Sequence, residues 1–357
     1  TNFQPIYQGG YFMKKYCVAF LILFLLSGCS GAPGTATISP SPMPTPTSTA
    51  TPAPSSQPVS ISIAAVGDNL IHSPIYNQAS RRTGGNGFDF TPAYQFVRSL
   101  WDSFDLTVIN QETPLGGTSM GLSNYPLFNS PQELGDDLVS LGFNTIIHAN
   151  NHVLDMNQEG LAATYEYWQT KPVTLLGIRK KSASNVQYIR SGGITIALAA
   201  YTYGTNGRTL PSDSPYAVSY ISNEMLEEIR NARSNADLVI VFLHWGNEYE
   251  TTANEQQISL AKQLAKENVD AVIGHHPHVI QPIELYARPD GKNMICAYSL
   301  GNFISCQNEA ATMLGGVLQL EFSGTTEDVS LETATFQPIV THYDRNYQNV
   351  RIYPLSQ

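Results

Sequence analysis

The feature that most constrains the fold is a regular alternation of short apolar runs and longer amphipathic stretches between residues 60 and 169. The apolar runs predict strands at 60–66, 106–109 and 145–147, and the amphipathic stretches predict helices at 90–101, 131–141 and 159–169. Strand and helix thus alternate three times, which is typical of α/β layering with parallel strands. The sequence therefore predicts an α/β domain in this region.

The remainder of the chain continues with the same kinds of element. We expect strands at 173–176, 186–189, 194–199, 238–243, 271–273, 294–298, 315–322 and 333–342, and helices at 223–234 and 255–267. No internal repeat and no second domain is evident in the pattern. We therefore expect residues 59–357 to form one folded domain.

The N-terminal part has the pattern of a secreted lipoprotein. Two lysines precede an apolar run at 18–26, which ends in Leu-Ser-Gly-Cys at 26–29. A basic start followed by a short apolar run is typical of a secretory signal. We expect translation to begin at Met13, residues 13–29 to act as the signal peptide, and Cys29 to carry the lipid.

The next stretch, residues 30–58, consists almost entirely of Ser, Thr, Pro, Ala and Gly. Such a segment has too little apolar surface to form a core, and its prolines favour extended conformations. We expect it to be a linker that tethers an extracytoplasmic domain to the cell membrane through the lipid on Cys29.

The charge balance limits the partners of the domain. The 357 residues carry a formal net charge of -10, and only 13% of them are charged. An acidic chain of this kind is not expected to be a general nucleic-acid binder.

Cys296 and Cys306 are the cysteines of the folded part. They could pair in an oxidising compartment or remain buried free thiols, and the sequence leaves both possibilities open.

Three of the eight histidines lie in the stretch Asp-Ala-Val-Ile-Gly-His-His-Pro-His at 270–278. We expect a short buried strand to end at Gly274. Pro277 restricts the residue before it to extended conformations, and residues two apart in an extended chain point the same way. His276 and His278 are therefore expected to direct their rings at one point. Neutral imidazole is a common metal ligand.

Polar side chains follow the other predicted strands as well, and ligands of α/β sheets gather at these strand ends. The candidate set contains carboxylates, an amide and imidazoles: Asp68, Glu112, Asn151, His152, His244, His276 and His278. A mixed nitrogen and oxygen set suits Zn, Mn or Fe better than Ca or Mg. It could hold one or two divalent ions. A two-metal site would generate hydroxide and stabilise both the attacking and the leaving oxygen of a displacement reaction.

Several motifs contain these residues. They are Gly67-Asp68, Asn110-x-Glu112, Ala149-Asn150-Asn151-His152-x-x-Asp155, His244-Trp245-Gly246-x-Glu248-Tyr249, Gly274-His275-His276-Pro277-His278 and Ser299-Leu300-Gly301-Asn302-Phe303. In this order they resemble the bacterial capsule-synthesis CapA family over about residues 61–340. That family is associated with poly-γ-glutamate production and is similar to the calcineurin-like metallophosphoesterases.

The resemblance implies an α/β fold of four layers, an αββα sandwich of the metallophosphatase type. It also implies which residues bind metal, with Glu112 in the place of a bridging aspartate. The implied ligands are Asp68, Glu112, Asn151, His244, His276 and His278. Phosphoesterases usually have a histidine two residues after the first aspartate. This chain has Leu70 there, and the nearest imidazole is His72.

The resemblance further implies that His152 protonates a leaving group. Asp155 is expected to orient a neighbouring side chain or to cap a helix. Glu248 is expected to act as a base or to contact the substrate. We expect His275 to lie beside the ligands or at the surface, and Asn302 to shape the floor of the site.

Two functions compete at this point. The first is a metal-dependent hydrolase that acts on a phosphoester or on a cell-surface polymer, with His152 as general acid. The second is a non-catalytic accessory protein that binds or guides poly-γ-glutamate or another anionic polymer during export, in company with the capsule-synthesis machinery. The second needs cations, and the candidates are Arg179, Lys180, Lys181 and Arg208.

Overall fold

The computed structural model describes residues 57–355. The predicted signal peptide at 13–29, the predicted lipid site Cys29 and nearly all of the predicted linker at 30–58 lie outside the described residues. The described fold begins with strand β1 at Pro58.

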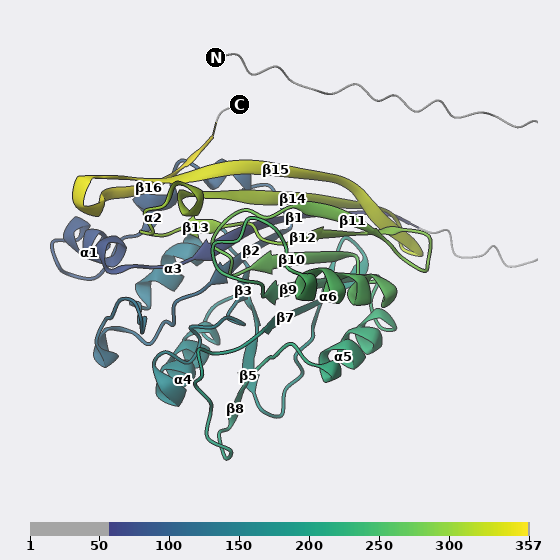
Figure 1. The fold of residues 1–357 in the computed structure, drawn as a ribbon, viewed down its shortest axis with the longest axis horizontal. Coiled ribbons are helices and arrows are strands. Elements are labelled where there is room, and N and C mark those ends of the chain that lie inside the picture. Colours follow the sequence, from purple (N-terminus) through teal and green to yellow (C-terminus); the bar gives the residue numbers. More distant parts are fainter. Residues whose placement is uncertain (1–56, 356–357) are drawn as a thin grey trace, which may run out of the picture. The chain divides into compact units, whose positions relative to one another are not determined.

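The first sheet has eight strands, and β1 lies inside it (Figure 1). The order is β16-β15-β14-β1-β2-β3-β4, and β13 also pairs with β1. The pairs β1–β2, β2–β3, β3–β4 and β1–β13 are parallel. The pairs β1–β14, β14–β15 and β15–β16 are antiparallel. The strands span Pro58–Asn69 (β1), Leu106–Gln111 (β2), Thr145–Ile147 (β3), Thr174–Leu176 (β4), Asn302–Ile304 (β13), Leu314–Thr325 (β14), Asp328–Asp344 (β15) and Gln348–Pro354 (β16).

The second sheet has six strands in the order β11-β12-β10-β9-β7-β6. Its inner strands β12, β10, β9 and β7 are parallel, and the edge strands β11 and β6 are antiparallel to their neighbours. The strands span Gln187–Ser191 (β6), Ile194–Thr202 (β7), Leu238–His244 (β9), Ala271–His275 (β10), Ile283–Ala287 (β11) and Asn293–Ala297 (β12). A separate pair is formed by β5 (Ile178–Lys180) and β8 (Tyr216–Val218).

The two sheets pack face to face with helices outside them, which confirms the predicted four-layer αββα architecture. In β1, Ile63 and Ala65 face the layer between the sheets, whereas Ala64 faces the outer layer. This alternation follows the two-residue period of a strand. Each Ile side chain that is fully buried between the sheets contributes roughly 1.5–3 kcal/mol to folding.

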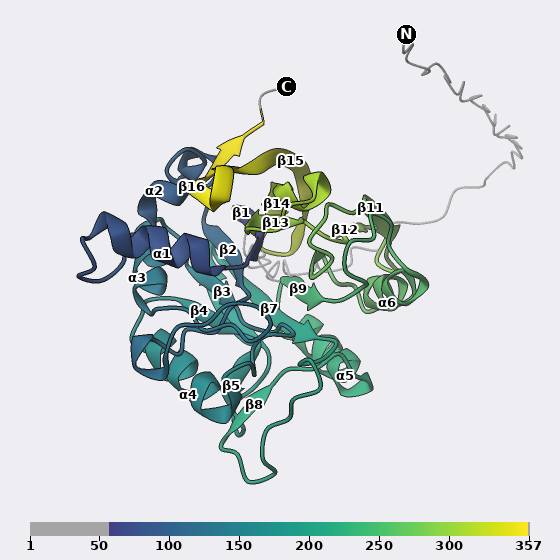
Figure 2. The same cartoon turned by 60° about the vertical axis from the view of Figure 1, so that its left-hand side comes forward.

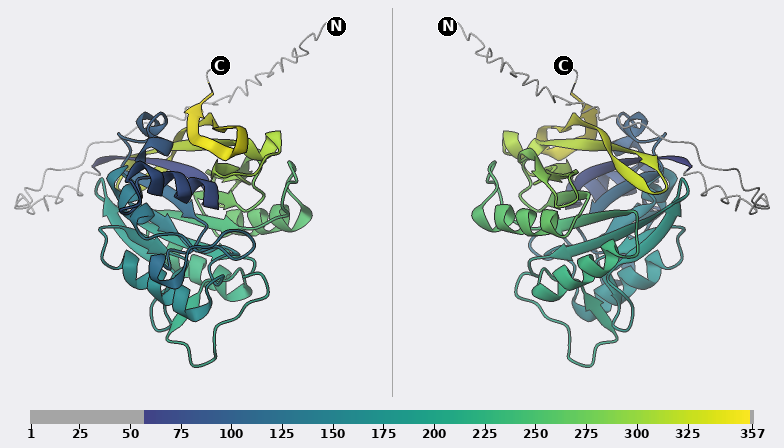
Figure 3. Two further views of the ribbon diagram at one scale, coloured as in Figure 1. Left: turned by 90° about the vertical axis from the view of Figure 1, so that its left-hand side faces the viewer. Right: turned by 90° about the vertical axis from the view of Figure 1, so that its right-hand side faces the viewer.

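The helices divide between the two outer faces (Figure 2). Apolar residues of α1, α2 and α3 pack on the first sheet, and those of α5 and α6 pack on the second. The helices span Ser73–Arg82 (α1), Thr91–Tyr94 (α2), Glu133–Ser140 (α3), Asn157–Trp168 (α4), Asn223–Arg233 (α5) and Glu255–Lys266 (α6). The C-terminal strands, yellow in Figure 3, lie on the same side of the domain as the purple β1.

The predicted helix at 90–101 is wrong. The structure has the single turn α2 and, after a break, a 3-10 turn at Arg98–Leu100. Side-chain contacts explain the break. Tyr94 donates its hydroxyl to the buried Asn69 Oδ1 at 2.9 Å, and Trp101 Nε1 donates to the Leu141 carbonyl at 2.9 Å. Both rings are buried, so tertiary packing outweighs local helix propensity.

Other differences concern elements without a strong sequence pattern. The pattern missed α1, β5, β8, β11, β13 and β16. Strand β11 is a largely exposed edge strand, and β13 has three residues that pair only at the end of β1. Cys296 and Cys306 are buried free thiols, so the predicted alternative of a disulfide between them is not realised. Within residues 57–355, none of the helices has the length and hydropathy needed to cross a bilayer.

Candidate metal centre

The site lies where the carboxyl ends of strands from both sheets meet. In the first sheet, Asp68 pairs with Asn110 of β2 and with Asn302 of β13. In the second sheet, His244 of β9 pairs with His275 of β10. Parallel strands that end together bring side chains from distant parts of the sequence to one edge, as the strand pattern predicts.

A close approach of two backbones positions Asp68. A Cβ atom on Gly67 would lie 1.9 Å from the carbonyl oxygen of Gly301, so only glycine fits there. The backbone N–H of Asp68 donates to the same carbonyl at 3.0 Å. The pairing register of β1 shifts beside this residue. The bulge re-aims the Asp68 side chain into the site.

The Asp68 carboxylate is completely buried and receives several contacts. Asn110 Nδ2 donates to Oδ1 at 2.8 Å, and the backbone N–H of His276 donates to Oδ2 at 3.2 Å. His278 Nδ1 lies 3.1 Å from Oδ2, and His275 Nδ1 lies 3.4 Å from Oδ1. Burial by itself would raise the pKa of Asp68, but its contacts with His275 and His278 hold the pKa well below the usual value. Asp68 is therefore an anion.

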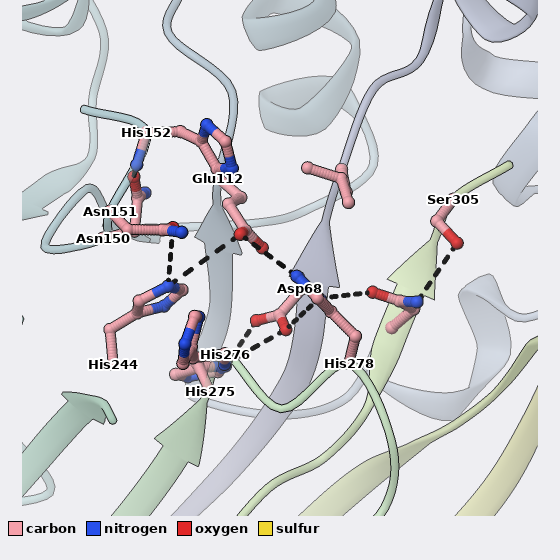
Figure 4. A network of polar contacts seen from close by, with 12 residues as sticks. Asp68, Glu112, Asn150, Asn151, His152, His244, His275, His276, His278 and Ser305 are labelled. Atoms are coloured by element: carbon pink, nitrogen blue, oxygen red, sulfur yellow. Dashed lines mark hydrogen bonds and ion pairs between the residues drawn. The ribbon is translucent and has the colours of Figure 1, made fainter. Parts of the chain in front are cut away.

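Glu112 stands in a different environment. Its side chain is also completely buried, and neither carboxylate oxygen has a hydrogen-bond partner. The nearest imidazole nitrogens are His278 Nε2 at 3.7 Å and His244 Nε2 at 3.9 Å (Figure 4). Burial raises the pKa of Glu112 well above its usual value, and the negative charges of Asp68 and Glu248 raise it further. A buried carboxylate without partners is costly unless a cation compensates it.

The second sheet provides neutral imidazoles. His244 Nε2 lies 2.9 Å from Asn151 Oδ1, and the centroids of the His244 and His276 rings are 4.7 Å apart. The Nδ1 atoms of both histidines are buried without a partner. Burial lowers the pKa of His244 well below its usual value and lowers that of His276 to about 3. Both rings are thus neutral, with one nitrogen of each free of a proton, which is the form that binds a metal.

His278 connects these groups. Its Nδ1 lies 3.0 Å from Asn302 Oδ1 as well as near Asp68, so Nδ1 carries the proton and Nε2 faces Glu112. Burial would lower the pKa of His278, but Glu112 and Asp68 raise it to about 9. The metal-free ring is therefore protonated on both nitrogens near neutral pH, and a bound ion would take the place of the proton on Nε2. With that exchange, the donor set fits a divalent transition ion. Asp68, Glu112 and His278 place ligand atoms within 4.8 Å of one another, and Glu248, His276 and His278 do the same.

The predicted extended conformation of the His-Pro-His segment is wrong. Strand β10 continues to His275, and His276 and His278 then adopt positive φ angles of 98° and 58°. Their rings nevertheless converge, with centroids 6.0 Å apart. A positive φ is uncommon for a residue with a side chain and is typical of backbone strain held at functional sites. A tight turn rather than an extended chain brings the two rings together.

His152 and Asp155 form a separate pair beside the metal-binding cluster. His152 Nδ1 lies 2.7 Å from Asp155 Oδ2, which also accepts the backbone N–H of Phe128 at 2.8 Å. The His152 ring meets the Phe128 ring edge to face at 4.8 Å. Asp155 thus fixes the orientation of the imidazole and leaves Nε2 as the nitrogen available to a ligand.

Two adjoining cavities of about 310 and 340 Å³ lie against the site. Tyr125, His152 and Glu248 line both cavities, and Arg208 lines the second. Phosphoryl or carboxyl groups that enter there would face an imidazole and a guanidinium. The cavities make the cluster accessible although its ligands are buried.

The structure also places residues that sequence reasoning described incompletely. His275 is buried beside Asp68, which is one of its two predicted positions. Asn302 Oδ1 contacts the Nδ1 atom of His278 and so orients that ring. Tyr203 was missed. Its half-exposed ring lies 4.7 Å from His276, and no motif marks it, although it directly follows β7.

Leu70 and His72 do not supply the imidazole that phosphoesterases usually have. Leu70 is buried. His72 Nδ1 accepts the backbone N–H of Cys306 at 3.2 Å, and burial lowers the pKa of His72 to about 4. His72 lines the first cavity without joining either cluster of possible metal ligands among the described residues.

The family model described as "Bacterial capsule synthesis protein PGA_cap" matches residues 62–307. The matched region contains the whole second sheet, most of β1, strands β2, β3, β4 and β13 of the first sheet, and every candidate metal ligand. The chain belongs to this family.

Two capsule-biosynthesis proteins of Bacillus species are similar to this chain. The PGA biosynthesis protein CapA of Bacillus subtilis (strain 168) is 28% identical over 262 residues, which cover 69% of this chain and 67% of that protein. The capsule biosynthesis protein CapA of Bacillus anthracis is 29% identical over 218 residues, which cover 57% of this chain and 52% of that protein.

Among solved structures, a 5'-nucleotidase precursor from Thermus thermophilus is similar with a TM-score of 0.48 and 11% sequence identity. The match covers 79% of this chain and 54% of that one. The fold assignment of this family member rests on its own two sheets and four layers.

Proposed function

We propose that this chain is an accessory protein of capsule synthesis with a metal-dependent hydrolase site that acts on a phosphoester or a cell-surface polymer. Membership of the capsule-synthesis family supports the first part. One observation carries the second. Glu112 is completely buried, and both of its carboxylate oxygens lack hydrogen-bond partners while imidazoles lie nearby. A divalent cation satisfies these atoms better than any protein group in the described structure.

The proposed ligands are Asp68, Glu112, Asn151, His244, His276 and His278. When bound, Mn, Zn or Fe would act as a Lewis acid and activate water for attack. The chain's own part is to hold the ligands in place. Asp68 fixes the Nδ1 proton of His278, and Asn151 contacts His244. Such contacts determine the orientation of ligand rings.

His152 is the proposed general acid. Asp155 holds His152 Nδ1 at 2.7 Å, so Nε2 is the atom that would deliver a proton to a leaving oxygen or nitrogen in the cavity. The buried Asp155 keeps the ring from rotating. Arg208 on the cavity wall would bind an anionic part of the substrate.

The second candidate function is guidance of an anionic polymer without catalysis. Only part of its predicted cation set favours it. Lys180 pairs with Glu166, and Lys181 donates to the Ser212 carbonyl at 3.0 Å. Arg208 is the one among the four predicted cations that lines a cavity at the site. A single such cation suits a small anionic group better than a long polyanion.

We further propose that the domain acts outside the cytoplasm, held at the membrane by a lipid on Cys29. The signal-like pattern at 13–29 supports this proposal. Metabolic labelling with a fatty-acid analogue is expected to mark the wild-type chain and not Cys29→Ser.

The hydrolase proposal is tested by metal analysis and turnover. Purified chain is stripped with a chelator, titrated with Mn²⁺, Zn²⁺ or Fe²⁺, and assayed on a chromogenic phosphodiester and on poly-γ-glutamate. We expect metal binding in the wild type, reduced binding in Asp68→Asn, and turnover that His152→Ala lowers without loss of metal. Metal binding without turnover of either substrate would favour the guidance function, and absence of metal binding would refute the proposed site.

A further inference from the structure

Glu248 is an exposed residue of the loop that follows β9, and it lines both cavities beside the site. One of its oxygens and a ring nitrogen from each of His276 and His278 all lie within 4.8 Å of one another. Sequence reasoning treats Glu248 as a base or a substrate contact. Its position beside two imidazoles calls for a different role.

We propose that Glu248 is a direct metal ligand, which completes the centre from its solvent side together with His276 and His278. The proposal rests on the proposed metal-binding function. It adds a third carboxylate to Asp68 and Glu112 and makes the loop of residues 245–250 part of the metal centre.

Backbone hydrogen bonds fix the loop to the histidine turn. Trp245 N–H donates to the His275 carbonyl at 3.1 Å, and Tyr249 N–H donates to the Pro277 carbonyl at 2.8 Å. These bonds lie on either side of Glu248. The carboxylate and the two imidazoles are therefore held in register by main-chain contacts, which is the preorganisation that a ligand set requires.

The outer part of the loop is fixed as well. Gly246 has a φ of 88°, and Trp245 Nε1 donates to the Tyr298 carbonyl at 2.9 Å. Gln281 Nε2 donates to the carbonyls of Glu250 and Thr252 at 2.8 and 3.1 Å. Exposure of Glu248 thus does not reflect a loose loop. The loop presents one carboxylate at a defined position over the cluster.

The centre also lacks a donor on the side of the cavity that Leu70, His72 and Glu248 line. Leu70 cannot bind a metal, and the Nδ1 of His72 is used by Cys306. In residues 57–355 the two clusters of possible ligands are Asp68-Glu112-His278 and Glu248-His276-His278, and they share His278. His276 has a buried Nδ1 without a partner, and Glu112 has two such oxygens. A carboxylate from the open side supplies a hard donor and negative charge that partly balances a divalent ion.

The test compares Glu248→Gln with Glu250→Gln in the full chain. Glu250 lies on the same loop and is exposed, and its carboxylate accepts a hydrogen bond from a neighbouring loop amide, Asn247 Nδ2, at 3.0 Å. Chelator-stripped proteins are titrated calorimetrically with Mn²⁺, and bound Mn²⁺ is followed by electron paramagnetic resonance. The visible spectrum of bound Co²⁺ reports the ligand set independently.

We expect Glu248→Gln to weaken Mn²⁺ binding at least tenfold and to change both spectra, with Glu250→Gln within twofold of the wild type. Glu248→Asp keeps the charge but shortens the arm, and we expect intermediate affinity. Thermal unfolding of the metal-free variants shows whether each is folded. Because Glu248 is exposed, unfolding temperatures equal to that of the wild type are expected.

The outcomes separate this inference from the proposed function. If the wild type binds Mn²⁺, Asp68→Asn weakens binding and Glu248→Gln does not alter affinity or spectra, the ligand role of Glu248 is overturned while the metal centre stands. If neither the wild type nor any variant binds Mn²⁺ or Co²⁺, the proposed function fails and the ligand role fails with it. Lost turnover with unchanged metal binding assigns Glu248 to the substrate and refutes our inference.

Discussion

At the scale of single residues, the site is defined by polar groups that the fold buries at a cost. Asp68 is compensated by four contacts, whereas Glu112 has no hydrogen-bond partner. Burial raises the pKa of both carboxyl groups, but only Asp68 has contacts that outweigh this effect. Asp68 has a lowered pKa and Glu112 a raised one. A difference of this kind between neighbouring acids is typical of functional sites.

We expect Glu112→Gln to stabilise the metal-free protein at pH 8. The pKa of Glu112 is higher in the folded than in the unfolded chain. The folded protein therefore has its full stability below about pH 4.5, where Glu112 is neutral in both states, and it loses stability as the pH rises toward the folded pKa. Gln removes the buried charge. Urea unfolding should show a gain of about 1–3 kcal/mol at pH 8 that disappears near pH 4, while Mn²⁺ affinity falls. A loss of stability at pH 8 would contradict this account.

Arg208 provides a second test at this scale. Its guanidinium lines the cavity with His152 and donates to Asn157 Oδ1 at 2.7 Å. We expect Arg208→Ala to weaken inhibition by inorganic phosphate about tenfold, because a charged hydrogen bond of roughly 1.5–3 kcal/mol is lost. Metal occupancy should not change. Lys181→Ala, which alters a cation outside the cavity lining, is the control, and equal effects of the two variants would rule out a specific role.

At the scale of elements, the ends of β1, β9 and β10 position the chemistry. Sequence pattern located these strands correctly because each is a buried apolar run. It also identified the residues that follow them, including Asp68 and His244. It could not foresee the turn at His276 and His278, because positive φ angles there depend on the Glu248 loop and the Asp68 carboxylate. Tyr203 was missed because only the tertiary fold carries it onto the imidazoles.

The close approach of Gly67 in β1 to Gly301, just before β13, can be tested by adding a side chain. We expect Gly67→Ala to destabilise the protein by about 3 kcal/mol or more, since its Cβ would meet the Gly301 carbonyl at 1.9 Å and neither backbone can move freely. Gly204→Ala is the matched control, because nothing lies within 4 Å of that position. Chemical denaturation of both variants measures the difference. Similar stabilities would show that the close approach is dispensable.

At the scale of the whole described domain, the candidate ligands divide between the two sheets. Asp68, Glu112 and Asn151 lie at or after the ends of strands of the first sheet, and His244, His276 and His278 lie at or after the ends of strands of the second. The α/β layering was predictable from alternating strands and helices, whereas the four-layer sandwich was predicted only through the family resemblance. The broken helix at 90–101 was not, because Tyr94 and Trp101 take their conformation from distant partners.

We expect bound metal to stabilise the domain as a unit. Free Mn²⁺ at a hundred times its dissociation constant should add about 2.7 kcal/mol to the free energy of unfolding. Scanning calorimetry should show one transition that moves to higher temperature with Mn²⁺ in the wild type and remains in place in His278→Ala. A shift of the same size in His278→Ala would place the stabilising ion elsewhere.

The division of the ligands between the sheets has a mechanical consequence. An ion at this edge would bind ligands from both sheets at once. Neither sheet would have a complete set of ligands before it has packed against the other. Metal uptake would then require that both sheets have assembled, and loss of the ion would remove one connection between them.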